Sequence, residues 1–158
     1  MAAPWQETLA QALTWSEAHP TLEAATADVP PALRGVRLER FPHSLWELVE
    51  HLRRAQADVL DLVANADYVA PVFPDDYWPR AAEPPSVDAW DACLAALVAD
   101  RARLEALVRG PTPALLAATP SAPELTAFGL VLQVLDHTAY HLGQIVMLRR
   151  QLGIWPGA

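Results

Sequence analysis

Lysine is absent from this sequence, so all 11 basic residues are arginines, and 19 acidic residues leave a formal net charge of −8. Proteins that bind nucleic acid through its phosphates carry a basic surface, and the acidic balance here gives no sign of one. The missing lysine and the abundant alanine are most simply the codon bias of a GC-rich genome. We therefore expect no nucleic-acid partner.

Cysteine is nearly absent as well. Cys93 is the only one, so no disulfide can form within the chain, which fits a reducing cytoplasm. Residues 1–7 lack the basic start and apolar run of a signal peptide. Charged residues interrupt every apolar stretch before it reaches the ~20 residues of a membrane span. We therefore expect a cytoplasmic protein without a membrane partner.

Glycine is scarce, with 6 residues, and the 15 prolines cluster in a few stretches. Apolar residues recur with a period near 3.6 in the segments between these stretches, and no segment alternates with period two. Four helices are predicted, at about residues 4–18, 44–65, 86–109 and 122–152. The Ser44–Glu47 and Ser121–Glu124 pairs have capping-box spacing, and Ser86 is the expected cap of the third helix. We predict an all-α fold, a four-helix bundle in which residues 1–158 form one domain.

The connector between the second and third predicted helices, residues 66–85, is long and carries aromatic residues among prolines. Fully extended it reaches ~65 Å, whereas a 21-residue helix is only ~32 Å long. The connector can therefore run back along the bundle and leave these two helices parallel. Two roles stay open for it: a lid over a functional site, or a cover for one end of the bundle.

His137 and His141 lie four residues apart on the last predicted helix, so their rings project from one face. Both fall near the apolar arc of that helix and point inward, with Gln133 and Gln144 extending the polar strip. Buried imidazoles need partners. Hydrogen-bonded core histidines are one explanation, and a divalent metal bound at ~2.1 Å is the other.

A third ligand for such an ion is available on the second helix. His51 borders the apolar stripe there and can reach the bundle interior. Glu47 and Glu50 are alternatives, although capping and a solvated face explain them more simply. Asp58 shares the face of His51 and is the better candidate for holding a ligand in place.

The remaining chemistry-bearing residues have simpler explanations. Gln144 and Tyr140 are candidates for orienting a substrate, and an outward position for Tyr140 is the alternative. We expect Asp136 and His19 to be solvated, His43 to shape the turn before the second helix, and Cys93 to pack in the core.

Three runs of sequence resemble the DinB superfamily of four-helix metalloproteins: SLWELVEHL at 44–52, HTAYHLGQI at 137–145 and LRRQLG at 148–153. The resemblance implies an up-down-down-up bundle with a long crossover between helices two and three. It also implies that His51, His137 and His141 are the metal ligands and that the protein is a homodimer. The metal would be zinc, nickel, iron or manganese, because three neutral imidazoles accept any of these ions.

Relatives in that superfamily include thiol-dependent transferases, isomerases and metal-dependent hydrolases. The resemblance therefore implies a small-molecule substrate, with a low-molecular-weight thiol as one candidate. A non-catalytic bundle that stores, senses or is stabilised by metal is the alternative, and a metal-free bundle that binds an apolar ligand is a third.

Overall fold

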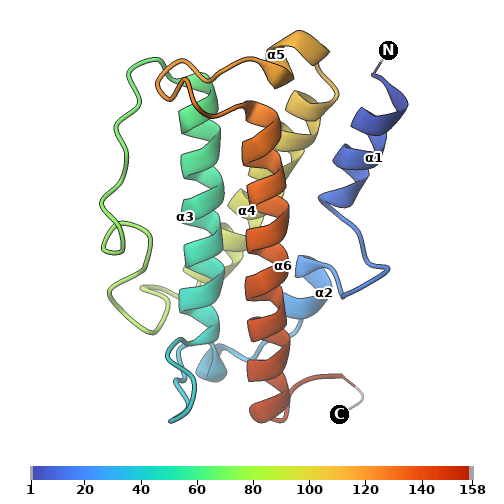
Figure 1. The fold of residues 1–158 in the computed structure, drawn as a ribbon. Coiled ribbons are helices and arrows are strands. Elements are labelled where there is room, and N and C mark those ends of the chain that lie inside the picture. The colour runs from blue at the N-terminus through green and yellow to red at the C-terminus, as the bar shows by residue number, and fades with distance from the viewer. Residues whose placement is uncertain (1, 157–158) are drawn as a thin grey trace.

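The computed structural model describes residues 2–156, so the ends of the expected domain 1–158 lie outside the described residues. Within that range the chain is helical, without named strands (Figure 1). Its elements are α1 (Pro4–Ala12), α2 (Leu22–Thr26), a 3-10 turn η1 (Pro31–Leu33), α3 (Leu45–Ala64), α4 (Ala89–Val108), α5 (Thr112–Leu116) and α6 (Ala127–Gln151). The predicted all-α bundle is confirmed.

Side-chain contacts give the relative directions of the long helices. Glu50 and Gln56 of α3 contact Cys93 and Leu97 of α4, in that order, so α3 and α4 run in the same direction. His51, near the start of α3, contacts His137 in the middle of α6. In Figure 1, α6 runs opposite to α3 and α4. The connector that follows α3, drawn in green, passes back along α3.

Local signals set several of the observed ends. The predicted capping box at Ser44 is present, because the Ser44 side chain accepts from the Glu47 amide while Glu47 accepts from the Ser44 amide. After α6, Gly153 adopts φ 70, a left-handed conformation that glycine takes without strain. It ends the last helix close to the predicted position.

Two predicted helices are shorter than expected. The first was predicted to end near residue 18, but α1 ends at Ala12 and only single turns follow through Trp15. The segment TWS at 14–16 is poor in strong helix formers. The third was predicted to start at Ser86, but a turn closed by the Ala89 amide and the Ser86 carbonyl delays α4 to Ala89. Val87, predicted to lie on the apolar stripe, is 79% exposed.

The fourth helix also starts later than predicted. The Ser121–Glu124 spacing does not form a capping box, because the Thr119 amide bonds to the Leu125 carbonyl and folds this segment into a closed turn. Thr126 is the actual N-cap of α6 and accepts from the Gly129 amide. The capping-box spacing at Ser121 therefore did not identify the N-cap of this helix.

The buried apolar residues form two clusters at opposite ends of the bundle. One joins α2 and the first half of α3 to the second half of α6. The other joins α1 and the second half of α3 to the first half of α6. On α6 the first cluster includes Leu142 and the second ends at Leu135, so His137 and His141 lie between them. Within residues 2–156, each helix is too short or too polar to cross a membrane.

Candidate metal centre

Three imidazoles meet between the two apolar clusters. His51 comes from α3, and His137 and His141 come from adjacent turns of α6. One nitrogen from each ring lies within 4.8 Å of the others. The Nε2 atoms of His51 and His137 are 3.1 Å apart. His51 and His141 are buried, at 5% and 6% exposure, while His137 is half-buried. The structure therefore brings together the three residues that the sequence singled out.

Hydrogen bonds at the far side of two rings determine which nitrogen faces the centre. His51 Nδ1 lies 2.9 Å from the Tyr77 carbonyl oxygen, so this nitrogen carries the proton and donates it. His141 Nδ1 lies 2.7 Å from Gln144 Oε1 and is assigned the same role. Both rings then present an Nε2 lone pair inward, which is the form that binds a metal.

The donor set fits a divalent transition metal. Two imidazole nitrogens bound to one ion at about 2.1 Å and about 90–110° apart lie about 3.0–3.4 Å from each other. The His51–His137 separation of 3.1 Å is in that range. The three rings are also steeply inclined to one another, with interplanar angles of 75°, 77° and 82°. Three nitrogens on one side of an ion leave its other side open.

The electrostatic setting keeps these imidazoles neutral. Burial lowers the pKa of His51 and of His137 below the usual histidine value. Burial lowers the pKa of His141 to about 4, against the opposing effect of its hydrogen bond to Gln144. Neutral imidazole is the ligand form, so these rings need lose no proton to bind a metal at neutral pH.

Trp78 of the connector covers the ring of His51. The two rings are stacked, with centroids 3.8 Å apart and an interplanar angle of 3°. His43 stacks on Trp78 as well, with centroids 3.9 Å apart. His43 thus does more than shape the turn before α3, although it contributes no nitrogen to the three-histidine cluster.

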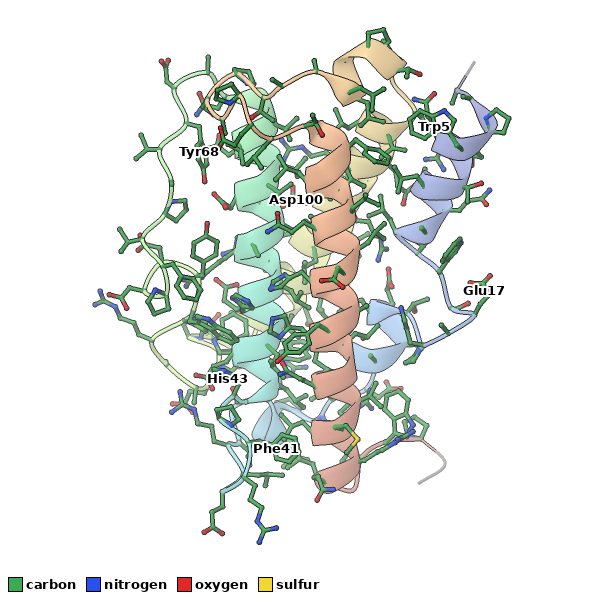
Figure 2. The ribbon with its side chains drawn as sticks, in the orientation of Figure 1. Trp5, Glu17, Phe41, His43, Tyr68 and Asp100 are labelled. Atoms are coloured by element: carbon green, nitrogen blue, oxygen red, sulfur yellow. The ribbon has the colours of Figure 1, made fainter. Side chains whose placement is uncertain are left out.

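The connector is fixed to α3 close to the centre. Asp58 accepts hydrogen bonds from the hydroxyls of Tyr68 and Tyr77, at 2.7 and 2.6 Å. Arg54 donates to the carbonyls of Asp76 and Trp78. Figure 2 shows Tyr68 in the connector beside one end of α3 and His43 near the other. Asp58 does not hydrogen-bond to a histidine; it reaches His51 only through Tyr77.

The other predicted residues are placed as follows. Gln144 hydrogen-bonds to a metal-ligand candidate, whereas Tyr140 is 64% exposed and touches His141 only through ring edges. Glu47 is the expected cap residue. Glu50 is buried, not solvated as expected, because Arg53, Arg54 and the Cys93 thiol all donate to it. Cys93 is buried, and Asp136 and His19 are exposed.

A cavity of about 510 Å³ opens in front of the three histidines. Its walls come from α3, α6 and the connector, and they include Asp58, Gln133 and Thr138. This volume is in the range of small-molecule sites. The cavity leaves the three histidines reachable from outside the bundle.

Sequence patterns did not identify Trp78, His43 or the Tyr77 carbonyl as parts of this centre. A stacked ring and a backbone carbonyl leave no motif in a sequence. The only signal was the clustering of Phe73, Tyr77 and Trp78 in a connector otherwise rich in proline.

Comparison with known proteins places the chain in a family. No curated protein and no solved structure matches it. The family model described as the DinB superfamily matches residues 14–145, which include α3, α4, most of α6 and all three histidines. The chain belongs to the DinB superfamily.

Proposed function

We propose that this protein is a metal-dependent transferase or hydrolase in which His51, His137 and His141 hold one divalent ion. The carrying observation is that three imidazole nitrogens, all within 4.8 Å of one another, converge at the inner wall of an open cavity. Zinc, nickel, iron and manganese all suit such a donor set.

The protein's own groups orient the ligands. The Tyr77 carbonyl and Gln144 hold the Nδ1 protons of His51 and His141, so the Nε2 atoms stay aimed at one point. When bound, a divalent ion lowers the pKa of a coordinated water or thiol and makes it a nucleophile at neutral pH. A low-molecular-weight thiol is therefore a suitable substrate for the transferase form of this proposal, supported by the family resemblance.

A non-catalytic role is the second candidate, and one observation favours it. The ligands join two different helices, so a metal ion would hold α3 against α6. Structural sites, however, are closed by four protein ligands. Among the described residues, the three histidines are the only group of potential metal ligands, and the group has three members, not four. The cavity leaves one side of this group accessible. These features favour an open, reactive site.

Assays of thiol conjugation to electrophiles and of ester hydrolysis, with metal-free and reconstituted protein, separate the two candidates. We expect turnover only with metal, abolished in His51→Ala and retained in His19→Ala, which removes an exposed histidine that is not part of the cluster. A large rise in thermal stability with metal, without any turnover, would support the scaffold instead.

The cellular setting is also a proposal. A single cysteine, buried in the core, fits the reducing cytoplasm. The family resemblance supports a homodimer, which size-exclusion chromatography with light scattering tests directly.

A further inference from the structure

Apolar and aromatic side chains form a large part of the walls of the cavity in front of the histidines. Leu52 and Val59 of α3 and Val134 of α6 line its depth, and Pro71, Phe73 and Trp78 of the connector line the side facing them. Phe73 is 74% exposed although it lines the cavity, which places it at the mouth. A substrate entering from solvent therefore meets an aromatic ring before it reaches the histidines.

Among residues 2–156, no arginine lines this cavity. Arg53 and Arg54 follow the cavity residue Leu52 directly in α3, but both are bound to the carboxylate of Glu50. One terminal nitrogen of Arg54 also donates to the carbonyls of Asp76 and Trp78, which binds this side chain to the connector. Both guanidinium groups are thus engaged by acceptors of the protein.

Acidic groups near the cavity would repel an anionic substrate. Asp58 lines the cavity, and its oxygens accept from two tyrosine hydroxyls, so the carboxylate is held in place there. Asp136 is exposed and precedes His137 on α6. An anionic group on the body of a substrate would meet the Asp58 carboxylate and no arginine in the cavity wall, and burying it unpaired would be costly.

We propose that this site selects substrates whose body is uncharged and apolar, aromatic above all, and that Phe73 at the mouth determines this preference. This inference rests on the proposed function, because it takes the three histidines as the metal end of the same cavity. Burial of an aromatic ring against Phe73, Trp78 and Val134 supplies the affinity, and the metal end receives the reactive group.

Cobalt-substituted protein and a matched set of thiols test the proposal. A thiol that binds cobalt as the thiolate, releasing its proton to the buffer, adds a sulfur-to-cobalt absorption band that can be titrated. The probes are benzyl mercaptan, the same molecule with a para carboxylate, and ethanethiol. We expect benzyl mercaptan to bind at least about tenfold more tightly than either of the others.

Two variants locate the preference. We expect Phe73→Ala to weaken benzyl mercaptan binding by about five- to tenfold and to leave ethanethiol unchanged. Val72→Ala is the matched control, because Val72 is an exposed neighbour, at 65% exposure, that does not line the cavity. Both side chains are exposed, so neither substitution disturbs the core.

The outcomes separate this proposal from the metal site itself. Equal or tighter binding of the carboxylated probe overturns the substrate preference and leaves the metal site intact. The same holds if cobalt binds but no probe adds the band, or if Phe73→Ala and Val72→Ala behave alike. Failure to bind cobalt at all overturns the proposed function, and this preference with it.

Discussion

His51 and His141 each engage their Nδ1 atom with an acceptor that comes from outside the histidine cluster. For His141 that acceptor is the side chain of Gln144, one turn further along α6. A partner of this kind fixes the tautomer and the ring orientation, and its loss commonly costs tenfold or more in metal affinity.

We therefore expect Gln144→Ala to weaken zinc binding by about tenfold. Gln133→Ala is the matched control: Gln133 lines the cavity without a hydrogen bond to a histidine, and its loss should leave the affinity within about twofold. Competition titration with a chromophoric chelator measures both. Equal affinities for the two variants would show that Gln144 does not position His141.

Cys93 is a buried core residue to which we assign no role at the metal centre. Burial, with the neighbouring Glu50 carboxylate, raises the pKa of its thiol to about 12. The thiol is therefore protonated and inaccessible at neutral pH. We expect iodoacetamide to leave it unmodified in the folded protein and to label it fully in denaturant, as measured by mass spectrometry. Rapid labelling of the folded protein would be inconsistent with this buried environment.

At the scale of elements, the connector after α3 contributes to the centre more than the sequence indicated. Its length predicted that it runs back along the bundle, and its aromatic residues left a lid and a cover equally open. In the structure the Tyr77 carbonyl accepts from His51, and Trp78 stacks on the same ring. The connector therefore orients His51, one of the candidate metal ligands.

Asp58 anchors this connector, so its effect on the metal should be indirect but measurable. We expect Asp58→Ala to release the hydroxyls of Tyr68 and Tyr77, to weaken metal binding several-fold and to shift the visible spectrum of the cobalt form. Asp61→Ala, one turn away on the exposed face of α3, should change neither. Asp58→Asn keeps one acceptor and should restore part of the affinity. A change in thermal stability alone, with an unaltered spectrum, would assign Asp58 a purely structural role.

Helix centres were predictable from the sequence, and helix ends only in part. The apolar period and the Ser44 capping box located α3 correctly, because those signals act within a few residues. The start of α6 was misplaced, because the backbone bond between Thr119 and Leu125 competes with the Ser121 cap. The three histidines were found because spacing and helix face are local properties. Trp78 was not, since its stacking depends on the tertiary path of the connector.

At the scale of the whole molecule, burying a neutral histidine cluster makes stability depend on pH. Burial lowers the pKa of His141 from the ordinary histidine value of 6.5 to about 4 in the folded protein. Between these values the unfolded chain binds more protons, so stability rises with pH. The stability that depends on a neutral His141 is fully present above about pH 6.5 and is lost as the pH falls toward 4.

For the metal-free protein we expect His141 to account for a loss of at most about 3 kcal/mol between pH 7 and pH 4. Urea unfolding at a series of pH values measures it. His141→Leu should flatten the profile over that window, while His19→Leu, at an exposed position, should leave it unchanged. Identical profiles for the two variants would contradict the burial of a neutral His141.

The most direct test of the metal centre is the metal content of untagged protein, reconstituted with zinc and then dialysed. We predict one equivalent of zinc per chain, retained by His19→Ala and lost by His51→Ala, His137→Ala and His141→Ala, each checked for folding by circular dichroism. Absence of stoichiometric metal from the unmodified protein, or full retention by the His51→Ala variant, would contradict a three-histidine metal centre.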